Sequence, residues 1–368
     1  MFFSCNRENL LNNINIVLKG VSNKSTLPIL ECILITVYKN NFKLTSNNLE
    51  LGIETNLIEA DVKEEGKIAI EAKIFFDIIK KLNGTTITLK KDEHNNLVIK
   101  SKHSKFKISI IESNDFPSIP VIKKENEYIM YQNDLKNMIK QTIFSIAQDE
   151  SKPILTGELI EIYDKHINIV SVDGYRISYK KSKLIKDNNN NTSVIIPGKI
   201  LNEISKILSN DPNEEISIFI GEKHVLFDLG ICIIVSRVIE GEYIKYKQSF
   251  FDDFKTKIFI SRTEFIAGLE RAILISRDVK KIPVKLEIKE NKIIINSNSE
   301  LGTSYEELTV ECDGDNLNIA FNPKYLIDAL KVIEEDKISI QFTTSLSPCI
   351  ITSIEYDDYK YLILPLRI

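Results

Sequence analysis

Six lysines recur at matching positions in three stretches of this 368-residue sequence, and their spacing suits contact with phosphate groups. Each stretch carries two lysines seven residues apart, which places them two turns from each other on one face of a helix. Repeated basic helix faces can follow a phosphate backbone without reading bases. The same spacing also fits ordinary solvated helix faces, so the lysines alone leave both interpretations open. They are Lys73 and Lys80, Lys199 and Lys206, and Lys324 and Lys331.

A short apolar strand followed by a helix is predicted to carry each lysine pair. In the central stretch, residues 194–196 are apolar, Pro197 and Gly198 break the strand, and the apolar residues that follow form one helix stripe away from the lysines. The stretches are residues 68–82, 194–208 and 318–333, and corresponding lysines are 126 and then 125 residues apart. The acidic residues Asp77, Glu203 and Asp328 keep the same register.

The period of about 125 residues predicts three repeated domains. We expect them at residues 1–125, 126–254 and 255–368. In each, a further helix is predicted before the lysine-bearing one, at residues 7–18, 134–146 and 263–275. The remaining segments read as strands, which indicates an α+β fold with two helices packed on antiparallel sheet in every domain.

Composition is that of an ordinary globular protein, with 43% hydrophobic and 27% charged residues. No run approaches 18 apolar residues and the first residues do not resemble a signal peptide, so we expect a soluble cytoplasmic protein. The net charge of −4 does not exclude nucleic acid, since basic side chains can gather on one face. Five cysteines without CxxC spacing indicate neither a disulfide framework nor a zinc site, and no metal or cofactor is expected.

The sequence gives little support for a catalytic function. Its four histidines are far apart, and it has neither an HExxH motif nor a glycine-rich phosphate loop. Asp173 beside Gly174 could be a catalytic carboxylate, but a tight turn is the favoured interpretation. Two alternatives remain from the residues: an enzyme acting on a small ligand near Tyr175 and Arg176, and a repeat scaffold that binds peptides but no DNA.

The apolar tail at residues 361–368, YLILPLRI, is the second feature that suggests binding. It could form a final edge strand that completes a sheet. It could also form the rim of a groove that receives an apolar peptide from a partner.

Several motifs, in order along the whole chain, resemble the bacterial DNA polymerase III β subunit family of sliding clamps. They are TLPIL at 26–30, DFPSI at 115–119, QDESKPILTG at 148–157, VDGYR at 172–176, IPGK at 196–199 and the terminal YLILPLRI. The resemblance implies the DNA clamp fold, with three clamp domains per subunit. It also implies a head-to-tail homodimeric ring around duplex DNA that tethers the replicative polymerase, without catalysis of its own.

The resemblance also assigns site residues. It implies that the six lysines face DNA together with the loop residues Lys24 and Gln148. It implies a pocket where the polymerase, the clamp loader and repair proteins dock a short apolar motif. The matching pocket positions are Leu155, Val172, Gly174, Tyr175, Arg176, Ile177, Ile244, Leu346, Leu362, Leu364, Pro365, Leu366 and Arg367.

Some of these positions depart from the family pattern. Ile244 stands where proline is common, Ser249 where an aliphatic residue is frequent, Val172 where threonine is usual, and leucines replace methionines in the tail. Leucine is less adaptable than methionine, so we expect a stiffer apolar pocket. For the subunit contact, the resemblance places Phe106 and Ile108 on an edge strand against Ile273 and Leu274 on a helix of the third domain. Pairing across subunits would protect that edge.

Overall fold

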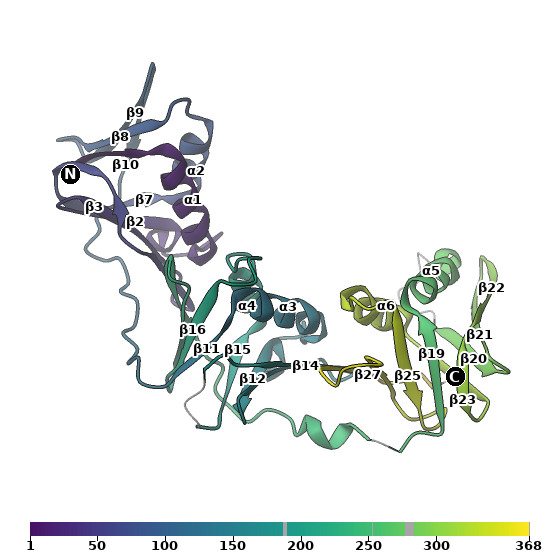
Figure 1. Cartoon of the computed structure of the whole chain (residues 1–368). Coiled ribbons are helices and arrows are strands. Elements are labelled where there is room, and N and C mark those ends of the chain that lie inside the picture. Colours follow the sequence, from purple (N-terminus) through teal and green to yellow (C-terminus); the bar gives the residue numbers. More distant parts are fainter. Residues whose placement is uncertain (187–189, 252, 277–282, 368) are drawn as a thin grey trace. The chain divides into compact units, whose positions relative to one another are not determined.

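The computed structural model describes residues 1–186, 190–251, 253–276 and 283–367, and the chain folds into two compact units (Figure 1). The first unit consists of the described residues within 1–133, 185–188 and 203–238. The second consists of those within 134–184, 189–202 and 239–368. Each unit contains helices packed on antiparallel sheets, which confirms the predicted α+β class.

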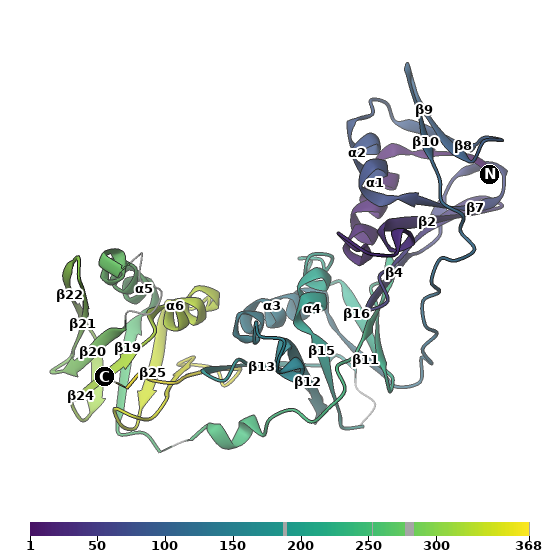
Figure 2. The ribbon, with the colours of Figure 1, turned by 180° about the vertical axis from the view of Figure 1, so that it is seen from behind.

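In the first unit, α1 (Arg7–Val17) and α2 (Ala72–Lys81) lie side by side (Figures 1 and 2). One sheet has the strand order β10-β9-β8-β1-β6, and the other has the order β11-β16-β17-β18-β4-β3-β2-β7 with β5 paired to β3. The strands are β1 (Phe2–Asn6), β2 (Cys32–Tyr38), β3 (Asn41–Asn47), β4 (Leu51–Thr55), β5 (Ile58–Glu59), β6 (Asp61–Glu64), β7 (Gly66–Glu71), β8 (Thr86–Lys91), β9 (Asn96–Ser101), β10 (Ser104–Ser109), β11 (Glu127–Tyr131), β16 (Glu215–Ile220), β17 (His224–Asp228) and β18 (Cys232–Arg237).

In the second unit, α5 (Arg262–Ala272) and α6 (Pro323–Val332) lie side by side (Figures 1 and 2). Its sheets have the orders β15-β12-β13-β14-β27-β26-β25-β19-β23 and β22-β21-β20-β24. The strands are β12 (Gly157–Tyr163), β13 (His166–Val172), β14 (Arg176–Lys183), β15 (Thr192–Pro197), β19 (Thr256–Ser261), β20 (Val284–Lys289), β21 (Lys292–Ser299), β22 (Gly302–Thr309), β23 (Glu311–Gly314), β24 (Leu317–Phe321), β25 (Lys337–Phe342), β26 (Cys349–Thr352) and β27 (Tyr359–Ile363). The remaining α-helices are α3 (Gln132–Thr142) and α4 (Gly198–Ser205).

The three predicted strand-helix stretches are confirmed as β7 with α2, β15 with α4, and β24 with α6. Side chains fix where two of these helices begin. The carboxylate of Glu71 accepts hydrogen bonds from the backbone amides of Lys73 and Ile74, and Asn322 Oδ1 accepts one from Lys324. Such caps satisfy amides that have no partner within the helix, so the lysine-bearing helices start at fixed residues.

The predicted helices at 7–18, 134–146 and 263–275 are present but end earlier. α1 stops at Val17, α3 at Thr142 and α5 at Ala272, and each is followed by a short 3₁₀ turn. Hydrogen bonds in a 3₁₀ turn join residues three positions apart instead of four, and sequence periodicity does not reveal such a turn. Leu274 was predicted on a helix, but it lies in the 3₁₀ turn after α5.

The apolar tail forms β27, which pairs with β14 on one side and β26 on the other. The alternative of a final edge strand is therefore wrong, because β27 lies inside its sheet. Tyr361, Leu362 and Ile363 are buried there, whereas Leu364 and Leu366 continue past the strand with exposed side chains. Ile368, the last residue of the predicted tail, lies outside the described residues.

Candidate functional site

The six lysines that recur in the sequence all have exposed side chains in the structure. Lys73 and Lys80 project from α2, Lys199 from α4, and Lys324 and Lys331 from α6, while Lys206 follows the end of α4. Some form ion pairs with carboxylates: Lys331 Nζ lies 2.7 Å from Glu270 Oε1, and Lys206 Nζ lies 2.5 Å from Glu203 Oε1. Exposed pairs of this kind contribute little stability, so these ammonium groups stay available to phosphates.

Lys24 and Gln148, the two loop residues assigned with the lysines, are also exposed. Each precedes a short 3₁₀ turn that begins at a proline, Pro28–Glu31 in the first unit and Pro153–Thr156 in the second. The loops therefore occupy corresponding places in their repeats.

The predicted pocket residues have a buried floor in the second unit. Leu155, Val172, Ile177 and Leu362 belong to one apolar cluster, and each has at most 9% of its surface exposed. Strands β13, β14 and β27 contribute three of them, and Ile177 faces Leu362 directly across the β14–β27 pair. This floor is continuous with the protein core, so its shape is fixed by packing.

Exposed apolar side chains come from the segments next to this floor. Tyr175 is 58% exposed and Leu346 is 68% exposed, and Ile244, Leu364 and Leu366 are also exposed. The tail is held to the second unit by its backbone: the Leu364 amide donates to the Tyr175 carbonyl, and the Leu366 amide donates to the Ala320 carbonyl. Exposed apolar side chains on segments that adjoin a buried apolar cluster suit contact with an apolar peptide.

Asp173 is a turn carboxylate, as the favoured interpretation predicted. Its Oδ1 accepts hydrogen bonds from the backbone amides of Tyr175 and Arg176 at 2.9 and 3.1 Å. Gly174, which follows Asp173 in the turn, has φ +90°, a left-handed conformation that L side chains rarely adopt. The turn thereby presents Tyr175 to solvent.

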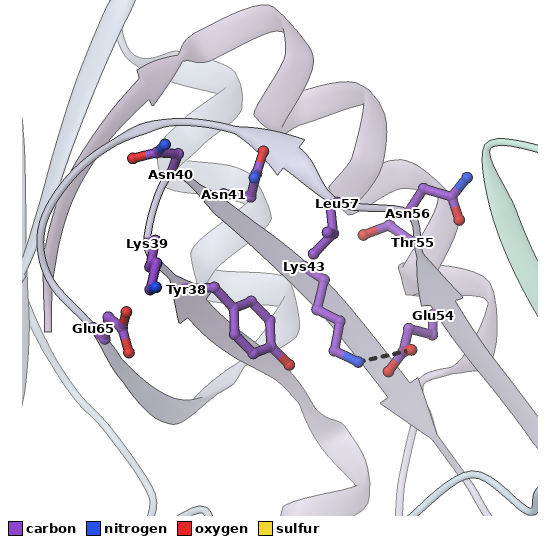
Figure 3. Close-up of a pocket in the computed structure, with 10 residues that line it drawn as sticks. All are labelled: Tyr38, Lys39, Asn40, Asn41, Lys43, Glu54, Thr55, Asn56, Leu57 and Glu65. Atoms are coloured by element: carbon purple, nitrogen blue, oxygen red, sulfur yellow. Dashed lines mark ion pairs between the residues drawn. The ribbon is translucent and has the colours of Figure 1, made fainter.

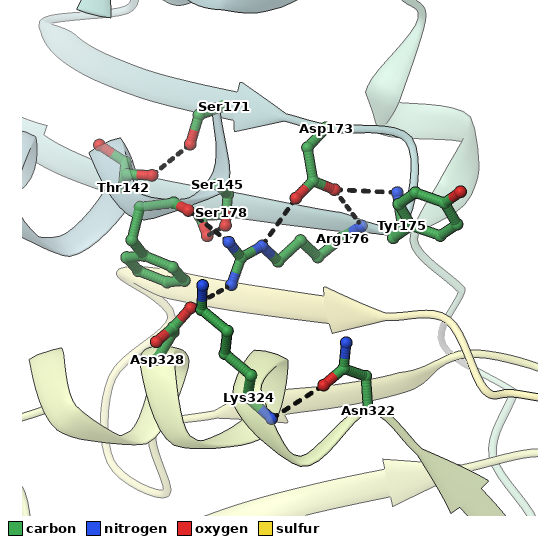
Figure 4. A network of polar contacts seen from close by, with 11 residues as sticks. Thr142, Ser145, Ser171, Asp173, Tyr175, Arg176, Ser178, Asn322, Lys324 and Asp328 are labelled. Atoms are coloured by element: carbon green, nitrogen blue, oxygen red, sulfur yellow. Dashed lines mark hydrogen bonds and ion pairs between the residues drawn. The ribbon is translucent and has the colours of Figure 1, made fainter. Parts of the chain in front are cut away.

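Arg176 is the one predicted pocket residue with a dense polar environment, shown in Figure 4. Its Nε donates to Asp173 Oδ2 at 2.9 Å, and one terminal nitrogen donates to Asp328 Oδ2 at 2.8 Å. The other terminal nitrogen donates to the carbonyl of Phe144 at 2.5 Å. The sequence analysis did not predict that Asp328 lies next to the pocket. The one sequence feature that singled Asp328 out was its register with Asp77 and Glu203.

The residues assigned to a subunit contact lie at two sheet edges. Phe106 is exposed and Ile108 half-buried on β10, an edge strand in the first unit. Ile273 and Leu274 follow α5 in the second unit, close to the edge strand β22, because the Ser304 hydroxyl donates to the Ala272 carbonyl at 3.2 Å. Phe106 and Leu274 are 41% and 49% exposed, so both apolar side chains are accessible to a partner.

A further pocket, of about 740 Å³, lies in the first unit beside β2, β3 and β4 (Figure 3). Its wall combines the exposed Tyr38 and Leu57 with the Lys43–Glu54 ion pair, whose atoms are 2.9 Å apart. None of the sequence-predicted site residues lines it. Within the described residues, no group of three histidine, cysteine or acidic side chains could hold a metal, and no helix is long and apolar enough to cross a membrane.

Comparison with known proteins agrees with this arrangement along the whole chain. Three family profiles match: the N-terminal domain of the DNA polymerase III beta subunit at residues 1–120, its central domain at 130–245 and its C-terminal domain at 247–367. The beta sliding clamp of Staphylococcus epidermidis is 34% identical over 376 aligned positions, covering 100% of this chain and 99% of the relative.

Solved structures give the same result. A putative DNA polymerase III beta subunit from Eubacterium rectale is 38% identical with a TM-score of 0.96, and each chain is covered completely. The DNA polymerase sliding clamp from Bacillus subtilis is 32% identical with a TM-score of 0.96, covering 100% of this chain and 99% of the other.

These matches and the repeated helix-on-sheet architecture define a sliding clamp, a protein that tethers a polymerase during DNA replication. The chain belongs to the DNA polymerase III beta subunit family. It is a processivity factor rather than an enzyme, so the alternative of a small-ligand enzyme near Tyr175 and Arg176 is not retained.

Proposed function

We propose that two copies of this chain join head to tail in a closed ring around duplex DNA. The recurrence of exposed lysine pairs at the same two positions of α2, the α4 region and α6 carries this proposal. Lys73, Lys80, Lys199, Lys206, Lys324 and Lys331, with Lys24 and Gln148, would contact phosphates. Contacts of this kind are independent of sequence and weak at moderate salt, which suits a ring that must slide. The acidic net charge of −4 would keep DNA from adhering elsewhere.

The ring would close through the edge strand β10 of one subunit and the β22 edge of the next. Phe106 and Ile108 would then contact Ile273 and Leu274 across the joint. Both edges present unpaired backbone groups, and pairing them satisfies those groups. Their charges are also complementary, since β10 carries Lys105 and Lys107 whereas β22 carries Glu306 and Glu307. Two such heterologous contacts close a ring if the rotation between subunits is a half turn.

The pocket of the second unit would receive short apolar peptides from the replicative polymerase, the clamp loader and repair proteins. Leu155, Val172, Ile177 and Leu362 supply its floor, and Tyr175, Ile244, Leu346, Leu364 and Leu366 supply apolar contacts around it. Gly174, Arg176, Pro365 and Arg367 complete the proposed site. The working ring would be cytoplasmic, with domain bounds at 1–125, 126–254 and 255–368, near the ranges of the three family profiles.

The experiment that tests the proposal measures DNA retention and peptide binding in one variant. Replacing Lys73, Lys199 and Lys324 by glutamate should abolish retention on DNA and leave peptide binding intact. Unaltered retention would count against the lysine assignment. Loss of peptide binding as well would indicate misfolding rather than a specific effect on DNA.

A further inference from the structure

Two residues of α6 contact the proposed partner pocket although neither belongs to its predicted lining. Asp328 Oδ2 accepts a hydrogen bond from Arg176 at 2.8 Å, and the two residues are 152 positions apart in the chain. The ring of Tyr325 stacks on that of Tyr175, with their centroids 6.1 Å apart. Two consecutive pocket residues are thus each held by a side chain from the same helix.

The guanidinium of Arg176 has little freedom in this environment. Its central carbon lies 4.5 Å from the ring centroid of Tyr325 and 5.2 Å from that of Phe144. Only 7% of the residue is exposed, and its guanidinium forms ion pairs with both Asp173 and Asp328. Asp328 supplies one of the three hydrogen bonds that hold the guanidinium, and a charged acceptor makes that bond strong, so Arg176 would take another position without Asp328.

The same strand-helix stretch also contacts the tail on which the pocket depends. Ala320 of β24, three residues before α6 begins, accepts the backbone hydrogen bond from Leu366 at 2.8 Å. Tyr325 and Asp328 are three residues apart and therefore share one face of α6. Lys324 and Lys331 lie on the same helix with exposed side chains (Figure 4 shows Lys324).

We propose that Asp328 is a positioning residue of the partner pocket. It fixes Arg176 in the orientation that an apolar partner peptide meets, so a carboxylate on the helix that carries Lys324 and Lys331 also affects peptide affinity. The inference rests on the proposed peptide binding at this pocket. It goes further by assigning a role to Asp328, which is not among the predicted pocket residues.

The test compares Asp328→Asn with Asp77→Asn in the full chain. Asp77 occupies the corresponding position of α2 in the first repeat and is exposed, so it is a matched control. The readouts are the affinity of a short fluorescent peptide whose apolar side chains are leucine and phenylalanine, the affinity for duplex DNA, and the melting temperature. We expect Asp328→Asn to weaken peptide binding roughly three- to tenfold, which is the range for residues coupled in one network. Asp77→Asn should leave peptide affinity unchanged.

Both substitutions remove a carboxylate near lysines, so both should raise DNA affinity to a similar extent. Asp328→Glu, which keeps the carboxylate, should restore part of the peptide affinity. Unchanged peptide affinity in Asp328→Asn, or equal losses in both asparagine variants, would overturn the positioning role. A separate variant, Leu364→Ser, reports on the pocket itself: if it binds peptide normally, the pocket assignment fails whatever Asp328 does.

Discussion

The backbone amide of Leu364 donates a hydrogen bond to the carbonyl of Tyr175 at 2.9 Å, which joins the end of the chain to the Asp173–Arg176 turn. Because this bond uses main-chain atoms, side-chain substitutions at Leu364 leave it intact. The exposed side chain of Leu364 can therefore be tested without loss of the attachment that places it.

Replacing Leu364 and Leu366 by serine should weaken the binding of an apolar partner peptide by about tenfold or more, since central apolar contacts dominate such interfaces. The melting temperature should change little, because both side chains are exposed. Fluorescence anisotropy with a labelled peptide measures the first effect and calorimetry the second. Ile354→Ser, at another exposed apolar position, is the control. Normal peptide binding by the double variant would refute the pocket assignment.

Charge reversal at Lys73, Lys199 and Lys324 should also reduce the salt dependence of DNA binding, because fewer counterions are released when fewer phosphates are neutralised. The control reverses Lys63, Lys223 and Lys285, which are exposed residues outside the lysine-bearing helices, one in each third of the chain. It changes net charge by the same amount. Equal losses in the two triple variants would mean that net charge, rather than these helices, governs DNA contact.

Phe106→Asp should shift the chain from dimer to monomer in sedimentation velocity, and so should Leu274→Asp. Each places a carboxylate in the proposed subunit contact, where it would be desolvated without a partner. Ile231→Asp changes an equally exposed apolar residue that is not part of that contact and should leave the dimer intact. A dimer that survives both Phe106→Asp and Leu274→Asp would exclude this joint.

Glu158 on β12 makes stability depend on pH. It is fully buried, and the loss of solvation on burial raises its pKa from the ordinary 4.5 to about 8. The unfolded chain therefore releases this proton at lower pH than the folded chain. Stability should fall by roughly 1 kcal/mol for each pH unit above the ordinary carboxyl pKa and level off above the folded value.

Glu158→Gln should remove this contribution and raise the urea midpoint most at the upper end of that range. Urea unfolding at several pH values between about 5 and 8 measures the slope. Glu59→Gln, at an exposed strand position, should leave the slope unchanged. Identical slopes for wild type and Glu158→Gln would show that this carboxyl group does not titrate as described.

Much of the fold was predictable because its signals are local. The apolar stripes of α2, α4 and α6 recur at a fixed period, and helix periodicity depends only on neighbouring residues. The lysine positions followed from the same repeat. The pocket residues were predicted from the resemblance of motifs to the family. The spacing of these residues in the sequence does not indicate that they lie in one site.

The remaining features depend on contacts between distant residues. Nothing near Arg176 in the sequence indicates that Asp328 and Tyr325 will hold it, because those contacts need β14 and α6 to meet in the folded unit. Likewise, β27 is an interior strand because it pairs with both β14 and β26. An apolar tail has the same sequence pattern whether it forms an edge strand or an interior strand. The ends of α3 and α5 were also predicted too late in the sequence, because a 3₁₀ turn takes the place of the last α-helical turn.

Retention on circular and linearised duplex DNA after loading, at moderate salt, tests the ring most directly. Weak phosphate contacts alone do not hold a protein on DNA under those conditions. A closed ring should stay on circles and slide off linear ends. Equal loss from both forms would contradict topological enclosure and leave ordinary electrostatic binding as the explanation of any DNA contact.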